Sequence, residues 1–160
     1  MHIRQTVFRD ADEVWAMLKP VFRSGETYAI DPTISKQDAL TYWTNADAGS
    51  YVIVNEDRLL GTYYLKTNAA GGGSHVCNCG FVTAPNSTGK GVARAMLDDA
   101  LSRAKKAHYK AMQFNFVLAN NTRAIDTWHR AGFETVGLLP KAFDHPVDGM
   151  IDALIMFKTL

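Results

Sequence analysis

Residues 82–97, VTAPNSTGKGVARAML, place two glycines around one lysine directly before an expected helix. Gly89 and Gly91 lack Cβ atoms and adopt left-handed backbone angles easily, so the chain can turn sharply and come close to a ligand here. The first N–H groups of the helix that follows have no partner within the helix, and the helix dipole makes this end positive. The turn therefore predicts a site for an anion, first of all a phosphate or pyrophosphate group.

Two common phosphate-binding loops do not match this spacing. A P-loop needs Ser or Thr directly after the lysine and an earlier glycine, whereas Gly91 follows Lys90 and Ala84 stands at the earlier position. A dinucleotide-binding fingerprint needs a third glycine where this chain has Arg94. The spacing therefore favours a different kind of loop.

The turn resembles the acyl-CoA loop of the GNAT acyltransferase superfamily. That loop reads Arg/Gln-x-x-Gly-x-Gly/Ala, which residues 88–93, TGKGVA, resemble, and residues 83–85, TAP, are similar to the Val-x-Pro that usually precedes it. Thr88 departs from the pattern by replacing a long side chain, but the cradle of backbone N–H groups does not depend on that side chain. The resemblance implies that acetyl-CoA, or another short acyl-CoA, binds at Thr88, Gly89, Lys90, Gly91, Val92 and Ala93.

A second block of residues supports the same resemblance. Asn121, Ala124, Trp128 and the Gly132-Phe133 pair are similar to the family's Asn-x-x-Ala, aromatic, Gly-Phe helix, and they follow the glycine turn in the same order. The resemblance implies that Asn121 and Trp128 contact the cofactor. Ordinary helix signals account for the same residues, with Asn121 as an N-cap and Gly132 as a helix stop, so this block alone leaves both interpretations open.

The strand before the turn is expected to hold the acyl group. In the resembling family a bulge separates this strand from its neighbour, and free backbone N–H groups hold the pantetheine arm and the thioester oxygen. Residues 80–83 occupy that position, so the resemblance implies cofactor contacts from Phe81, Val82 and Thr83. One such donor stabilises a transition state by ~3 kcal/mol.

Acetyl transfer to an amine also needs a base, since an amine with a pKa near ~10 is almost wholly protonated at neutral pH. Many relatives carry a glutamate on the strand before the loop, where this chain has Asn78, which can orient a water but cannot take a proton. Trp128 occupies the place of a tyrosine acid and is a donor but no practical acid. Glu26 is the leading substitute base, followed by Asp31, His145 and Asp148, although a solvated loop residue is the simpler interpretation of each.

Hydrophobic periodicity predicts the elements that position these residues. An Asp10-x-x-Glu13 capping box is expected to open a first helix that Pro20 ends or kinks, and a second helix begins at about Ser35. The glycine turn leads into an amphipathic helix, and Asn121 opens a short one. Strands are expected at residues 2–7, 51–54, 60–66, 75–83, 111–118, 134–139 and 150–158. The fold class is thus α/β (α+β), a central mixed, mostly antiparallel sheet of about seven strands flanked by about four helices.

Composition bounds the remaining possibilities. The length of 160 residues predicts a single domain over residues 1–160. The formal net charge of only +1 predicts that nucleic acid is not a partner. Its longest apolar run, residues 153–157, is far below the ~20 residues of a membrane span, so no membrane partner and a cytoplasmic location are expected. Cys77 and Cys79 lack a second pair for a zinc site, so we expect buried thiols and no metal.

The expected function is transfer of an acetyl group from acetyl-CoA to a primary amine of a small molecule or amino acid. The loop GETYAIDPT resembles that of acetyltransferases of amino acids and phosphinothricin-like compounds. The alternative is a catalytically silent acyl-CoA-binding or sensor domain, because the usual Glu and Tyr positions hold Asn78 and Trp128. The acceptor is expected to be a small molecule, and a homodimer is expected to use the closing strands, whose connection AFDHPVDGM belongs to the dimer interface or to the acceptor pocket.

Overall fold

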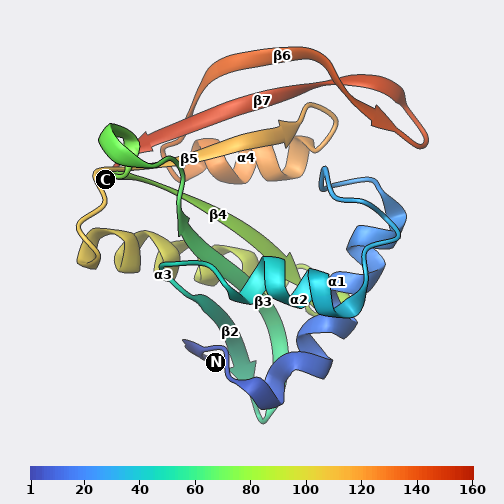
Figure 1. Ribbon diagram of the computed structural model, residues 1–160, viewed down its shortest axis with the longest axis vertical. Helices are drawn as coiled ribbons and strands as arrows, with labels where there is room; N and C mark the ends of the chain where they lie inside the picture. The colour runs from blue at the N-terminus through green and yellow to red at the C-terminus, as the bar shows by residue number, and fades with distance from the viewer.

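The strands form one mixed sheet, described over residues 1–160 by a computed structural model. Their order is β1-β2-β3-β4-β5-β7-β6, and every neighbouring pair is antiparallel except β4 and β5 (Figure 1). The seven strands are β1 (His2–Gln5), β2 (Ser50–Asn55), β3 (Arg58–Thr67), β4 (Val76–Thr83), β5 (Ala111–Leu118), β6 (Glu134–His145) and β7 (Gly149–Thr159). The predicted fold class is confirmed.

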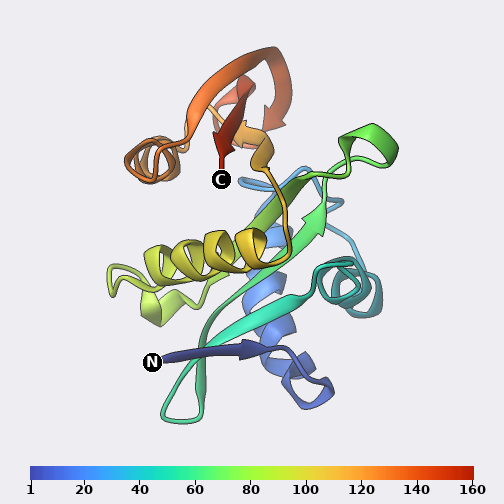
Figure 2. The ribbon, with the colours of Figure 1, turned by 90° about the vertical axis from the view of Figure 1, so that its left-hand side faces the viewer.

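Four helices cover the two faces of the sheet: α1 (Ala11–Ser24), α2 (Lys36–Thr44), α3 (Val92–Lys106) and α4 (Thr122–Arg130). Figure 2 shows α3 and α4 on one side of the sheet and α2 on the other. Side chains alternate along β3, so Tyr63 and Leu65 pack in the core beneath α3, while Tyr64 packs in the core beneath α1 and α2. The two faces of β3 therefore contribute to two separate cores.

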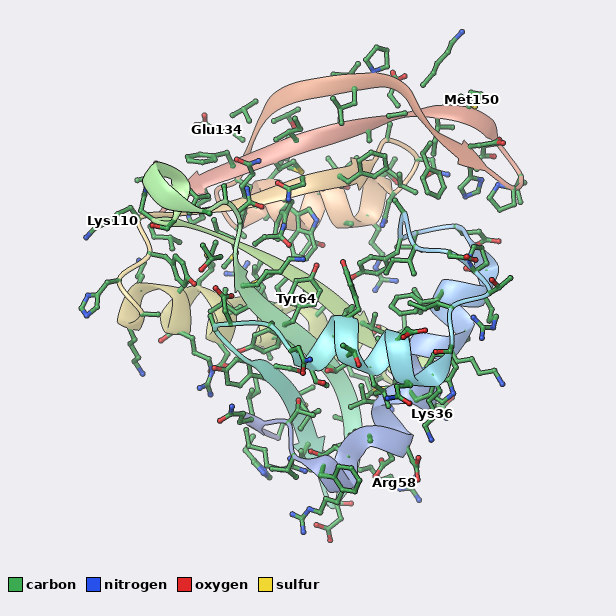
Figure 3. All side chains as sticks on the ribbon, viewed as in Figure 1. Lys36, Arg58, Tyr64, Lys110, Glu134 and Met150 are labelled. Atoms are coloured by element: carbon green, nitrogen blue, oxygen red, sulfur yellow. The ribbon has the colours of Figure 1, made fainter.

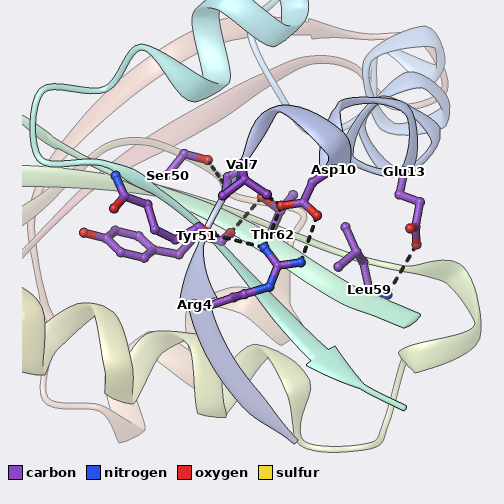
Figure 4. A network of polar contacts seen from close by, with 10 residues as sticks. Arg4, Val7, Asp10, Glu13, Ser50, Tyr51, Leu59 and Thr62 are labelled. Atoms are coloured by element: carbon purple, nitrogen blue, oxygen red, sulfur yellow. Dashed lines mark hydrogen bonds and ion pairs between the residues drawn. The ribbon is translucent and has the colours of Figure 1, made fainter. Parts of the chain in front are cut away.

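Asp10 does not form the predicted capping box with Glu13. Its carboxylate accepts two hydrogen bonds from the guanidinium of Arg4, at 2.7 and 2.8 Å, and a third from the backbone nitrogen of Val7 (Figure 4). Glu13 instead accepts a hydrogen bond from the backbone nitrogen of Leu59 at 3.4 Å. The capping-box prediction is wrong because both carboxylates bind groups outside α1.

Two other predicted boundaries differ from the structure. The first helix does not end at Pro20 but continues to Ser24, since the side chains of Leu18 and Phe22 on either side of the proline pack in the same core. The strand predicted at residues 134–139 extends to His145, because β7 continues to pair with it as far as His145 and Gly149. In both cases tertiary packing or pairing overrides the local sequence signal.

The parallel strands β4 and β5 pair over only two residues and then diverge. Cα partners are Val76 with Ala111 and Cys77 with Met112, and β4 stays paired with β3 without a register shift as far as Thr83. The register shift lies in β5, against β7, between Phe114 and Val117. The strands separate as predicted, but the expected bulge in β4 is absent because the irregularity lies in its neighbour.

Candidate active site

The divergence of β4 and β5 coincides with a cavity of about 620 Å³ that both faces of the sheet help to line. One end meets the amino end of α3, and the other meets the loop between α1 and α2. Residues of β3, β4, β5 and α4 line the space between these ends. The lining includes Tyr28, Tyr42, Tyr64, Lys66, Asn78, Phe81, Thr83, Thr88, Gly89, Gly91, Val92, Ala93, Arg94, Asn115, Asn121, Arg123 and Trp128.

The glycine turn presents unpaired backbone donors at the position predicted for an anion. Gly89 and Gly91 have φ angles of 81° and 76°, and Gly91 is the residue that precedes α3. The backbone N–H groups of Gly91 and of the next three residues, up to Arg94, donate to no acceptor in the protein. Thr88 hydrogen-bonds the carbonyl of Pro85 at 3.3 Å, so its side chain supports the turn itself. Four unpaired donors at the positive end of a helix are suited to a phosphate or pyrophosphate group.

The second block of the sequence also lies at the cavity. Asn121 caps α4 by accepting a hydrogen bond from the backbone nitrogen of Ala124 at 3.2 Å, and Gly132 ends the helix with a φ of 86°. Trp128 packs between Phe81 and Phe114, with ring centroids 5.5 and 4.8 Å away, and its indole N–H makes no hydrogen bond. The helix-signal interpretation of Asn121 and Gly132 therefore holds, and both Asn121 and Trp128 line the cavity as well.

The backbone of Phe81 faces the gap between β4 and β5. The hydroxyl of Tyr28, from the loop after α1, accepts a hydrogen bond from the Phe81 nitrogen and donates one to the Phe81 carbonyl, each at 3.0 Å. Burial raises the pKa of Tyr28, so the hydroxyl stays protonated. The strand edge expected to hold a thioester thus carries a tyrosine hydroxyl in this structure.

Asn78 spans the point where the two strands separate. Its side-chain nitrogen donates to the carbonyl of Gln113 on β5 at 2.8 Å, and its side-chain oxygen accepts from the hydroxyl of Tyr64 at 3.3 Å. Asn78 is 6% exposed and lines the cavity. The amide thus joins the strands where backbone pairing stops, and each end keeps one further hydrogen-bonding site.

None of the four residues considered as a base lines the cavity. Glu26 is exposed just beyond the end of α1, and Asp31 accepts two hydrogen bonds from Thr33, which lower the pKa of that carboxyl. His145 Nδ1 accepts from two backbone nitrogens of the β6–β7 turn, and Asp148 accepts from Asn120. Because Nδ1 of His145 is an acceptor, its 3.6 Å approach to Asp148 is not an ion pair. Each of these groups except Glu26 has a local structural partner.

Sequence reasoning missed Tyr28, Tyr42, Tyr64 and Lys66, which line the end of the cavity near α1 and α2. Tyr64 lies near the centre of the molecule, where its ring leaves no room for a Cβ on Gly80 (Figure 3). One signal was available, because Tyr64 and Lys66 alternate on β3 with residues that face the other core. Their pairing with residues of β4 could be assigned only with the register in hand.

The two cysteines lie on one side of β4 and are free thiols in the core beneath α3, buried as expected. Burial raises the pKa of Cys77 to about 12 and raises that of Cys79 as well, so both are protonated at neutral pH. The helices lack the combination of length and apolar composition that a membrane span requires. No group of three or more His, Cys, Asp or Glu side chains is placed to hold a metal ion.

Comparison with known proteins identifies relatives of this chain. A sequence profile of the acetyltransferase (GNAT) family matches residues 11–133. N-acetyltransferase aca1 of Schizosaccharomyces pombe is 29% identical over 134 residues, which are 74% of this chain and 64% of that protein. The match thus spans less than two thirds of that relative's length.

Solved structures share the fold over nearly the whole chain. A GCN5-related N-acetyltransferase from Kribbella flavida is 31% identical, with a TM-score of 0.95 that covers 99% of this chain and 97% of that one. A Salmonella typhimurium structure, described as an acetyltransferase with its cofactor acetyl-CoA, has a TM-score of 0.86 at 16% identity and covers 100% of this chain and 94% of its own. At that identity the second likeness concerns the fold alone.

Proposed function

The chain belongs to the acetyltransferase (GNAT) family, and from this premise we propose that it transfers an acetyl group from acetyl-CoA to a primary amine of a small molecule or amino acid. The observation that carries the proposal is the cavity, which joins four unpaired N–H groups at the amino end of α3 to the separated edge of β4. A nucleotide thioester has an anionic end and a reactive end, and the cavity offers a suitable group for each.

The donor fits the residues that line the cavity. The N–H groups of Gly91 to Arg94 would hold the pyrophosphate, with Arg123 as a further cation at the same end. The pantetheine arm would follow the edge of β4, which β5 leaves unpaired beyond Cys77. The backbone N–H of Phe81 would then bind the thioester oxygen, once the hydroxyl of Tyr28 has moved away from it.

In the reaction the amine nitrogen forms a bond with the acyl carbon, and the bond from that carbon to sulfur breaks. The oxygen of the tetrahedral intermediate becomes negative, and the N–H of Phe81 stabilises it. The cavity contains no carboxylate or imidazole, so water takes both protons that the acceptor nitrogen loses: one from the ammonium group before attack, and one from the tetrahedral intermediate before the amide forms. CoA leaves as a thiolate that takes its proton from solvent, and the indole N–H of Trp128 can donate a hydrogen bond to it but cannot supply that proton.

A thiol-release assay tests the proposal. The purified protein is mixed with acetyl-CoA and a panel of amines and amino acids. Release of CoA is followed with a thiol reagent, and the mass of the product is measured by mass spectrometry. We expect enzyme-dependent CoA release and a mass gain of one acetyl group on at least one acceptor. Tight acetyl-CoA binding without CoA release from any acceptor would instead identify a silent binding or sensor domain.

The assembly we propose is a homodimer in the cytoplasm. Val136 and Leu138 on β6 and Met150 on β7 are each more than half exposed, and a second copy could cover them. Residues of β6 and β7 do not line the cavity, so this surface is available without blocking the site. The free thiols of Cys77 and Cys79 suit a reducing compartment. A monomeric mass by light scattering at micromolar concentration would contradict the dimer.

A further inference from the structure

The charged residues that line the cavity are all cationic. They are Lys66, Arg94 and Arg123, and the lining includes no Asp, Glu or His. Arg94 and Arg123 belong to α3 and α4, beside the expected phosphate site. Lys66 lies on β3, on the face that packs against α1 and α2. The cation at Lys66 is thus separate from those that the phosphates of the donor would meet.

The side chain of Lys66 is positioned but has no polar partner. It pairs in register with Asn78 across the β3–β4 ladder, and both line the cavity. Its Nζ lies 5.1 Å from the ring centroid of Tyr42 and 5.0 Å from that of Tyr64. It donates no hydrogen bond and lies within 4.0 Å of no carboxylate. Two ring faces thus hold the ammonium beside the cavity while its three N–H donors stay free.

We propose that Lys66 binds a carboxylate of the acceptor, so that the acceptor is an amino acid or a similar amine that carries a carboxylate. This inference rests on the proposed function, since it names the substrate class of the same cavity. A single ammonium with free donors matches a monoanion, and an ammonium–carboxylate pair is stronger than a neutral hydrogen bond. The lining offers no carboxylate that could bind an ammonium group of the acceptor.

The same charge assists the chemistry that the cavity otherwise leaves without a base. By pairing with the acceptor carboxylate, Lys66 would cancel the attraction between that carboxylate and its own ammonium group, which lowers the pKa of the amine. The neutral, nucleophilic form is then more abundant at neutral pH. A polyamine without an anionic group would meet only repulsion from Lys66, so we expect such acceptors to react poorly.

Paired acceptors test the role of Lys66. Amino acids are compared with their carboxamides, which keep the amine and the side chain but lack the carboxylate. The variants are Lys66→Met, which keeps the stem on the tyrosine rings, Lys66→Arg, which keeps the charge, and Lys106→Met, which removes an exposed charge at the end of α3 as a control. Both kcat/KM and KM are measured for each acceptor. Calorimetric binding of the amino acid to the protein–CoA complex gives a readout that needs no turnover.

The wild type and Lys106→Met should prefer the amino acid. Lys66→Met should lose about 10- to 100-fold in kcat/KM for the amino acid, mainly through KM, while the carboxamide should lose none, because it has no carboxylate for Lys66 to bind. Lys66→Arg should recover part of the preference. Equal effects of Lys66→Met on both acceptors, or none, would overturn the inference while CoA release still supported the proposed function. If no acceptor releases CoA, weaker amino-acid binding by Lys66→Met than by the wild type would still support a carboxylate site at Lys66. Equal amino-acid binding by the wild type and Lys66→Met would refute that site.

Discussion

The hydroxyl of Tyr28 lies 3.0 Å from both the backbone nitrogen and the carbonyl oxygen of Phe81. These two groups face the side of β4 that β5 leaves unpaired, so a residue from the loop after α1 satisfies the edge where a thioester would bind. A ligand that takes this edge must first displace the hydroxyl. In the proposed binding mode, Tyr28 therefore opposes acyl-donor binding.

Tyr28→Phe should bind acetyl-CoA more tightly, by about fivefold or more, because the donor no longer displaces two hydrogen bonds of ~0.5–1.5 kcal/mol each. Tyr42→Phe is the matched control, since its hydroxyl lies 3.5 Å from that of Tyr64 and makes no hydrogen bond to β4. Isothermal titration calorimetry of both variants measures the change. Unchanged or weaker binding by Tyr28→Phe would show that the thioester does not use the backbone of Phe81.

Gly91→Val should lower CoA affinity by about 100-fold, because a branched residue cannot hold the left-handed angles that direct the N–H groups at the phosphates. Gly149→Val is the matched control, with a φ of 70° against 76° and, like Gly91, no atom within 4 Å of an added Cβ. Both variants should lose similar stability in urea unfolding. Equal CoA binding by the two variants would contradict the site at the glycine turn.

The acidic limb of the kcat/KM profile should follow the pKa of the acceptor. The cavity contains no carboxylate or imidazole, and burial raises the pKa values of Tyr28 and Tyr64. The value of kcat/KM should therefore rise with pH until the acceptor amine is neutral. Its decrease at low pH should come from protonation of the acceptor and not from protonation of a base on the enzyme. Profiles for two acceptors whose amine pKa values differ by about 1 unit check this. A limb at the same pH for both would indicate a titrating group of the enzyme.

Glu26→Gln should leave kcat and KM nearly unchanged, since Glu26 is exposed and does not line the cavity. Steady-state kinetics at saturating acetyl-CoA measure both constants, and Glu134→Gln, at an exposed position in β6, is the control. A fall in kcat of ~10²-fold, with loss of the acidic limb, would identify Glu26 as the base that the sequence alone suggested.

Asp10→Asn should lower the free energy of unfolding at pH 7 by about 2 kcal/mol, because a carboxylate with three donors is lost. The hydrogen bonds from Arg4 lower the pKa of Asp10, so its contribution is present above the ordinary value of 3.8 and is lost as the pH falls through the lowered value. Urea unfolding should show that the free energies of unfolding of the wild type and the variant converge below about pH 4. Asp12→Asn, whose partner is the exposed Lys36, should change stability little at any pH, and an equal effect of both would refute this account.

The sequence predicted well the features that depend on local conformation. Gly89, Gly91 and Gly132 have the positive φ angles expected of turn and helix-end glycines, and Asn121 caps α4. The buried stripe of α3, with Met96 and Ala100, follows the helical period of the sequence. These signals are reliable because the residues that produce them also form the turn, cap or stripe.

The predictions that failed each depended on contacts outside the segment that carried the local signal. Asp10 lies next to a helix that it does not cap, because Arg4 and Val7 compete for its carboxylate. Pro20 stays within α1 because packing on both sides of it outweighs the missing hydrogen bond. The bulge lies in β5 and not in β4, which only the pairing with β7 decides.

By itself, the sequence determined the fold class, the glycine turn and the free N–H groups at the start of α3, since all three follow from periodicity and from angles that only certain residues adopt. The tertiary structure decided what surrounds the reacting atoms. It brought Tyr28 onto the backbone of Phe81 across 53 positions of the chain, placed Lys66 opposite Asn78, and left Glu26 outside the cavity. These contacts depend on strand register and on loop packing, which a single sequence does not specify, because side chains far apart in the chain meet only once the sheet has formed.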